Sequence, residues 1–95
     1  MTKADIVRQI ALETGIEHNV VLTIVESFMS NVKGNMLNGE NVYLRGFGSF
    51  ILKERAQKTA RNIKKNTTLV INAHSIPAFK PAKEFHNQVK AKTTK

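Results

Sequence analysis

Apolar residues near the start of the chain recur at helical spacing. Those between positions 6 and 11 fall at three- and four-residue steps, which predicts a helix over about 3–14. Thr2 followed by Asp5 resembles a capping box, with Asp in the place of the usual Glu. Gly15 is suited to the left-handed residue that ends a helix, so local signals mark both ends of this element.

A second and longer helical pattern begins near positions 17–19 and ends at Asn38-Gly39. Lys33 is its only basic residue, whereas a helix that enters a DNA groove needs several cations and polar side chains. We therefore expect the apolar face of this helix to lie in the core or in a subunit interface rather than in a groove. That face consists of Val21, Ile24, Val25, Phe28, Met29, Val32 and Met36.

Beyond Gly39 the apolar positions alternate, which is typical of β-strands. A strand over 42–45 is followed by a turn at Gly46-Phe47-Gly48 and by a second strand that begins at Ser49. The β-branched run at 67–71 predicts a further strand, and Lys64–Asn66 is the only plausible reversal before it. These strands form a long hairpin whose outer half has almost no apolar residues.

Two prolines frame the last part of the chain. Pro77 and Pro81 bracket Phe79, and Pro81 suits the first turn of a closing helix over about 82–90. On that helix Ala82, Phe85 and Val89 share one face, and residues 91–95 look frayed and basic. The whole pattern predicts an α+β fold with two N-terminal helices, a three-stranded antiparallel sheet extended by a long β-arm, and a short C-terminal helix.

The charge of the chain is concentrated in its second half. The formal net charge is +8; residues 1–52 contribute −1 and residues 53–95 contribute +9, from eleven Lys and Arg against two Glu. Such a surplus indicates an anionic partner, most commonly a phosphate backbone. The alternative is a merely solubilising surface, which would not require the charge to gather in one half.

Several function classes are excluded by what the sequence lacks. It has no Cys, no apolar run that could span a membrane and no visible signal peptide, so we expect a cytoplasmic protein without a membrane partner. His18, His74 and His86 have no ligands at metal-binding spacing and are interpreted as surface histidines. Gly46-Phe47-Gly48 begins a dinucleotide fingerprint, but Ile51 stands where a third glycine is required. We expect no enzyme, no metal and no cofactor.

The basic hairpin predicts a ligand of its own. Ordering such a segment costs about 1–2 kcal/mol per residue in conformational entropy and buries little apolar surface in return. Its alternating cations can follow the phosphates on both sides of a duplex groove, and Ile63 near the tip can act as a wedge between base steps. Local packing of Ile63 within the arm is the alternative. The cations are Lys53, Arg55, Lys58 and Arg61.

These features together resemble the HU/integration host factor family of bacterial DNA-bending proteins, most closely HU. The resemblance rests on the Gly46–Phe50 turn, the arm through Arg61-Asn62, the Ile76–Pro81 segment and the two-helix start, and it covers residues 1–90. It implies one domain at 1–90 with an arm at about 53–72 and a tail at 91–95, in an intertwined dimer. At the tip this sequence has Ile63 where the family usually has proline, and Lys65-Asn66 where it has Thr-Gly.

The family resemblance also implies roles for individual residues. The helix N-termini near Thr2 and Pro81 would favour phosphate. The implied DNA-binding residues are Lys3, Gly46, Gly48, Lys53, Arg55, Lys58, Arg61, Asn62, Ile63, Lys64, Lys65, Lys80 and Lys83. The implied dimer core consists of Phe28, Val32, Leu44, Phe47, Phe50 and Phe79.

The function expected from the sequence is that of a homodimeric nucleoid protein that bends and compacts duplex DNA with little sequence preference. Nicked, gapped or already bent DNA should bind more tightly, because part of the cost of unstacking is already met. Three alternatives remain open. They are a sequence-selective subunit that pairs with a different chain, as in integration host factor, a protein that binds structured RNA, and one that binds acidic polymers.

Overall fold

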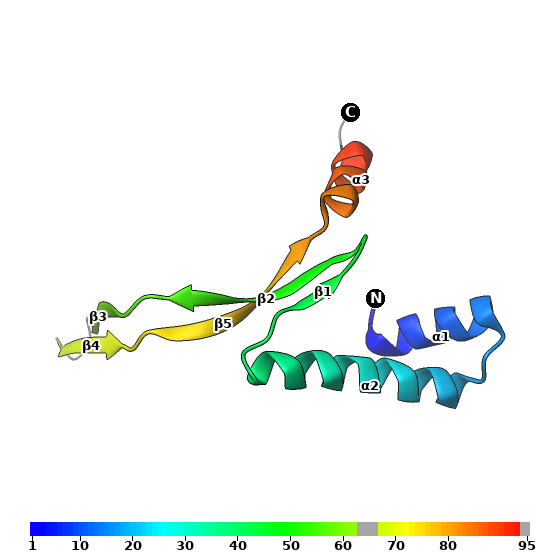
Figure 1. The fold of residues 1–95 in the computed structure, drawn as a ribbon, viewed down its shortest axis with the longest axis horizontal. Coiled ribbons are helices and arrows are strands. Elements are labelled where there is room, and N and C mark those ends of the chain that lie inside the picture. The colour runs from blue at the N-terminus through cyan, green and yellow to red at the C-terminus, as the bar shows by residue number, and fades with distance from the viewer. Residues whose placement is uncertain (63–66, 94–95) are drawn as a thin grey trace. The chain divides into compact units, whose positions relative to one another are not determined.

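The computed structural model describes residues 1–62 and 67–93 (Figure 1). The chain forms two compact units, residues 1–35 and 36–95, which are described separately below. The elements in chain order are α1 (Lys3–Thr14), α2 (His18–Leu37), β1 (Val42–Leu44), β2 (Gly48–Arg55), β3 (Lys58–Asn62), β4 (Thr67–Ile71), β5 (His74–Pro81) and α3 (Lys83–Thr93).

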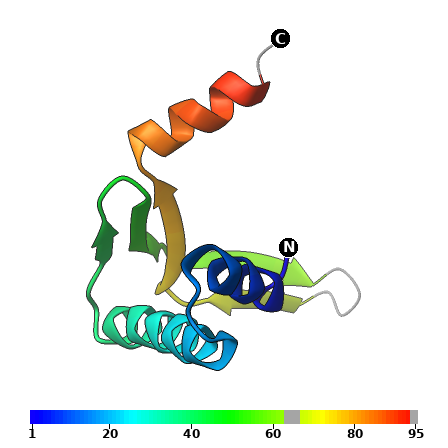
Figure 2. The same ribbon diagram turned by 90° about the vertical axis from the view of Figure 1, so that its right-hand side faces the viewer.

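The first unit is a helical pair whose ends confirm the local signals in the sequence. The Asp5 backbone N–H donates to Thr2 Oγ1 at 3.3 Å, and the Thr2 backbone N–H donates to Asp5 Oδ2 at 3.0 Å, which completes the capping box. Gly15 ends α1 in the left-handed region with φ 75°. The helices run antiparallel, side by side, in both views (Figure 1, Figure 2).

The second unit is built on a three-stranded antiparallel sheet, as predicted, and its strand order is β1-β2-β5. Gly46, with φ 82°, makes the turn between β1 and β2, and the Phe47 N–H donates to the Leu44 carbonyl at 3.0 Å. Strand β2 then pairs along its whole length with β5, from Gly48 opposite Pro81 to Arg55 opposite His74. This ladder joins the body of the unit to the root of the arm.

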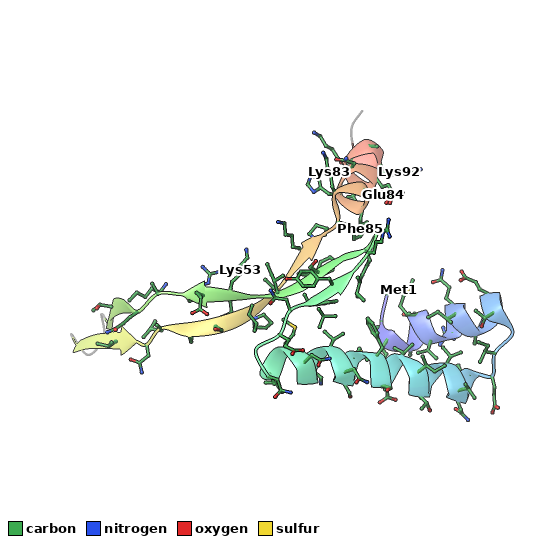
Figure 3. The ribbon with its side chains drawn as sticks, viewed as in Figure 1. Met1, Lys53, Lys83, Glu84, Phe85 and Lys92 are labelled. Carbon is green, nitrogen blue, oxygen red and sulfur yellow. The ribbon has the colours of Figure 1, made fainter. Side chains whose placement is uncertain are left out.

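One face of the sheet carries an aromatic cluster. Phe50 and Phe79 are cross-strand partners with ring centroids 5.1 Å apart. Phe47, from the turn, lies 5.1 Å from Phe79 and 5.7 Å from Phe85. Figure 3 shows Phe85 on the first turn of α3, so the cluster joins the turn, two strands and the closing helix.

The closing helix differs from the prediction at both ends. Pro81 is the last residue of β5 and not part of a helical turn, because the Ala82 N–H donates to the Phe47 carbonyl and prolongs the strand pairing by one residue. The Ala82 carbonyl then accepts the first helical bond, from His86 N–H at 2.8 Å. The helix continues to Thr93, beyond the predicted end at 90, because the residues that were expected to fray include good helix formers and the basic Lys92 in its last turn.

The arm consists of two successive ladders rather than one. The β2–β5 ladder ends at Arg55 opposite His74, and β3 and β4 form a separate two-stranded sheet that begins with Lys58 opposite Ile71. Residues 56–57 and 72–73 belong to neither sheet. The predicted reversal at Lys64–Asn66 lies outside the described residues.

None of the helices described in residues 1–62 and 67–93 is long and apolar enough to cross a membrane.

Gly48 should not tolerate a side chain. A Cβ at this buried position would lie 2.5 Å from Phe79 Cζ and 2.7 Å from the Lys80 carbonyl oxygen, so the aromatic cluster or the β5 backbone must move. We expect Gly48→Ala to destabilise the protein by about 1–3 kcal/mol, as overpacking does, measured by thermal or urea unfolding. Gly34→Ala is the matched control, because a Cβ there meets nothing within 4 Å. Equal stability of Gly48→Ala and the wild type would contradict this packing.

Candidate nucleic-acid interface

The face of the sheet opposite the aromatic cluster carries the cations. Side chains alternate between the two faces along a strand, so the residues between the aromatic positions of β2 and β5 share this second face. Lys53 and Arg55 from β2 lie on the same face as Lys80 from β5, and Figure 3 shows Lys53 projecting away from its strand. The complete cationic face consists of Tyr43, Ser49, Ile51, Lys53, Arg55, His74, Ile76, Ala78 and Lys80.

The acidic residue of β2 lies on the other face. Glu54 stands between Lys53 and Arg55 in the sequence, so its side chain points to the opposite side of the strand. There its Oε1 accepts a hydrogen bond of 3.0 Å from Ser75 Oγ, the hydroxyl of its cross-strand partner. Among the described residues of β1, β2 and β5, the cationic face therefore has no acidic side chain.

A shallow pocket lies where the β1–β2 turn meets the start of α3. Arg45, Lys80 and Lys83 line it, together with the backbone of Gly46 and Gly48. Four residues implied by the resemblance are thus brought together. Arg45 was not among them, although its place directly before the glycine turn was a signal for it.

The rim of this face holds an exposed phenol. Tyr43 Oη accepts a hydrogen bond of 3.2 Å from Asn41 Nδ2. The Oδ1 of the same amide accepts from the Leu52 N–H at 3.0 Å, so Asn41 fixes Tyr43 to the β2 backbone. The Tyr43 side chain is 72% exposed and its O–H can donate to a ligand. Sequence reasoning missed this residue because one Tyr in an alternating strand carries no distinctive signal.

A second pocket lies at the root of the arm, where the two ladders meet. Arg55 and Lys58 line it together with His74, Ile71 and Ile76. His74 Nδ1 lies 2.9 Å from the Asn72 carbonyl oxygen. Among the described residues no three His, Asp or Glu gather closely enough to hold a metal ion. Each pocket is lined by at least two cationic side chains, which are suited to an anionic ligand.

Comparison with known proteins identifies the family of this chain. The family model described as "Bacterial DNA-binding protein" matches residues 1–90, which is nearly the whole chain. The chain belongs to the HU/integration host factor family. The family and the fold expected from the sequence are thereby confirmed.

Curated family members and solved structures are similar over almost their full lengths. Integration host factor subunit alpha of Shewanella oneidensis is 33% identical over 94 residues, which cover 99% of this chain and 96% of that protein. A cocrystal structure of Anabaena HU with DNA has a TM-score of 0.87 and 29% identity, covering 94% of this chain and 97% of that one. An HU mutant from Thermotoga maritima has a TM-score of 0.70 and 22% identity, covering 94% and 99%, and shows the shared fold.

The remaining residues implied by the HU resemblance lie in several places. Lys3 belongs to the first unit, where its Nζ lies 3.9 Å from Glu26 Oε2 in an exposed ion pair. Arg61 and Asn62 occupy β3, opposite Thr68 and Thr67. Ile63, Lys64 and Lys65 lie outside the described residues.

The implied dimer core is divided between the two units. Phe28 and Val32 belong to the first unit, on α2. The other implied core residues belong to the second unit, and Phe85, which touches Phe47, was missing from the implied set. The members in the second unit are Leu44, Phe47, Phe50 and Phe79.

The N-terminus of α1 already holds a negative charge. Its capping carboxylate, Asp5, accepts from the Thr2 backbone N–H, and the Arg8 guanidinium donates to Asp5 Oδ1 at 3.3 Å. The backbone hydrogen bond from Thr2, followed by its side-chain bond, lowers the pKa of Asp5 below the ordinary 3.8. The positive end of this helix, which we expected to attract phosphate, is therefore already compensated by the Asp5 carboxylate.

The Asp5 cap should make stability depend on pH in the acid range. Because the pKa of Asp5 is lower in the folded than in the unfolded chain, its ionised form stabilises the fold above about pH 3.8, and this contribution is lost as pH falls through the lower, folded pKa. Melting temperatures measured from about pH 6 to about pH 2.5 should fall less for Asp5→Asn than for the wild type. Glu13→Gln, on the same helix, is the control. An identical acid loss in wild type and Asp5→Asn would show that the cap contributes nothing.

Proposed function

We propose that this protein is a non-catalytic, homodimeric DNA-bending protein that binds duplex DNA with little sequence preference and compacts it in the bacterial nucleoid, in the cytoplasm. The observation that carries the proposal is the sorting of charge on the sheet. Lys80, Lys53 and Arg55 follow one face from the body to the root of the arm, and the neighbouring Glu54 lies on the other face. A face of this kind binds a line of phosphates.

The geometry of the arm favours a duplex groove as the place of contact. A two-stranded hairpin is thin enough to lie along a minor groove, with cations at the phosphates on either side. Stacking on single-stranded bases needs aromatic side chains near the cations. Apart from the imidazole of His74, Tyr43 is the only aromatic on the cationic face of the described strands. The similarity to an HU structure solved with DNA supports the same partner.

Little sequence preference follows from the kinds of side chain on this face. Reading of bases depends on side chains that form specific hydrogen bonds to base edges, whereas lysines on phosphates position a protein without reading sequence. The described part of the cationic face contains Lys and Arg but no Asn or Gln. Two amides lie beside this face: Asn41, whose Nδ2 donates to Tyr43 Oη, and Gln57, in the pocket at the root of the arm. Contact is therefore dominated by the backbone of the duplex.

The need for a second copy follows from how little apolar surface one chain buries. Among the described residues, the buried apolar side chains are Val7, Val21 and Val32, all in the first unit. In the second unit Phe47 and Phe79 remain 47% and 39% exposed even within their cluster. Aromatic surface of this extent is typical of an interface. We therefore place the aromatic face of the sheet in the dimer.

A second candidate function is favoured by the curated family members. Those with the stated similarity are named integration host factor subunit alpha, so a sequence-selective subunit paired with a different chain is the alternative. Sedimentation of the purified chain separates the two proposals. A homodimeric protein sediments as a dimer when it is purified alone, whereas a subunit that needs a different chain does not. Competition of one labelled duplex against unrelated duplexes, and against duplex RNA, then measures selectivity.

Binding should weaken steeply with salt. Each neutralised phosphate contributes about −0.9 to the slope of log K against log salt. We expect Arg55→Ala, which removes one contact from each arm of a dimer, to flatten this slope by about two units and to weaken binding to every duplex alike. Fluorescence anisotropy over a salt series measures both. Lys33→Ala, outside the cationic face, is the control. A changed preference among sequences in Arg55→Ala would favour the selective alternative.

The aromatic cluster should be required for assembly. Phe47→Ala removes the ring that contacts both Phe79 and Phe85, and Phe→Ala in a core costs about 3–5 kcal/mol. We expect the variant to dissociate or unfold in sedimentation velocity and circular dichroism. Tyr43→Ala, an aromatic change on the opposite face of the sheet, should leave the dimer intact. A wild-type chain that sediments as a folded monomer would contradict the proposed assembly.

A further inference from the structure

His74 occupies a distinctive place at the root of the arm. It is the first residue of β5 and pairs with Arg55, the last residue of β2. Its exposed side chain belongs to the cationic face and lines the pocket between the two ladders. In the sequence nothing separates His74 from the other two histidines. Its register with Arg55 now places it beside the cations of the arm.

One hydrogen bond determines which nitrogen of the neutral His74 ring carries the proton. A carbonyl oxygen only accepts hydrogen bonds, so the contact of 2.9 Å between His74 Nδ1 and the Asn72 oxygen places the proton of the neutral ring on Nδ1. Nε2 of that neutral ring is then a bare acceptor and cannot donate to a phosphate oxygen. A second proton on Nε2 converts it into a charged donor while the bond to Asn72 is kept.

Among the described residues, the charged side chains that line the pocket with His74 are positive. Arg55 faces it from β2 and Lys58 from β3, while β4 and the next part of β5 contribute Ile71 and Ile76. Lys53 lies two residues further along the same face. The adjacent carboxylate, Glu54, points to the opposite face and is bonded to Ser75. Among the described residues, no acidic side chain lines the pocket to neutralise a charged ring.

We propose that His74 is a proton-dependent phosphate contact, so that each arm binds duplex DNA more tightly when the His74 ring is charged. The inference rests on the proposed function, because DNA supplies the phosphate. A phosphate held by Arg55 and Lys58 stabilises the charged ring, and the charged ring adds a third donor to that phosphate. Imidazole is the side chain whose ordinary change of charge falls between about pH 5 and 8, which sets the two pH values of the test.

The test compares affinity at two pH values in four forms of the full chain. Binding to one random duplex is measured by fluorescence anisotropy at about pH 5.5 and about pH 8.0, at constant ionic strength. The wild type should bind about tenfold more tightly per arm at the lower pH, the scale of one hydrogen bond to a charged group. His74→Gln should lose most of this gain, and His74→Lys should keep the higher affinity at both pH values. His86→Gln, a histidine on α3, should behave as the wild type.

The salt slope provides a second readout. Lowering the pH should steepen the wild-type slope by about 0.9 per arm, and His74→Gln should show no such change. Thermal melting shows whether each variant is folded at both pH values. The same pH dependence in wild type and His74→Gln, or none in the wild type, would overturn this inference while leaving the proposed function intact. A wild type that binds no duplex at either pH would overturn the proposed function and this inference with it.

Discussion

The pairing of β2 with β5 is the constraint on which the second unit depends. Because side chains alternate along both strands, one register places Phe50 and Phe79 on one face and Lys53 and Lys80 on the other. A shift of one residue would exchange the two faces and expose the aromatic rings in place of the cations. Gly48 permits this register, since Phe79 and the Lys80 carbonyl occupy the space that a Cβ would need. The proposed binding face and the proposed dimer face are thus two sides of a single ladder.

The proposed dimer links stability to function. The second unit has no buried apolar side chain among its described residues, although its aromatic cluster joins the turn, two strands and α3. A unit of this size gains little from a partly exposed core. If a second copy covers the aromatic face, the sheet becomes rigid and its opposite face is left for the ligand. The stability of such a protein depends on its concentration, and a ligand that spans two arms stabilises the dimer as well.

The predictable parts of this structure are those with local signals. Thr2, Gly15 and Gly39 mark helix ends by backbone chemistry that needs no distant partner, and the alternation around Gly46 marks a turn between strands. The parts that were missed depend on distant partners. Pro81 stays in the strand because the next residue bonds to Phe47, and the break in the arm at 56–57 follows from a change of pairing partner.

The residues of the candidate site also divide into those with local signals in the sequence and those that depend on distant partners. The cations of the arm could be named from composition and spacing alone. Tyr43 and His74 could not, because their relevance comes from the bond to Asn41 and from the pairing with Arg55, whereas Arg45 could have been found from its place before the glycine turn. The family resemblance placed Gly48 among the implied DNA-binding residues. In the structure this glycine also leaves the space that the Phe79 ring occupies.

The net charge of the arm does not explain why its two faces differ in charge. Residues 53–55 carry two cations and one carboxylate, so their net charge is only +1. Alternation separates them, because the strand places Glu54 on the face away from Lys53 and Arg55, where Ser75 binds its carboxylate. Physiological salt screens charges over about 8 Å, so a phosphate on the cationic face interacts mainly with the nearest side chains. The arm therefore has one cationic side for the proposed contact with a duplex, and the selective and the unselective forms of the proposed function both use it.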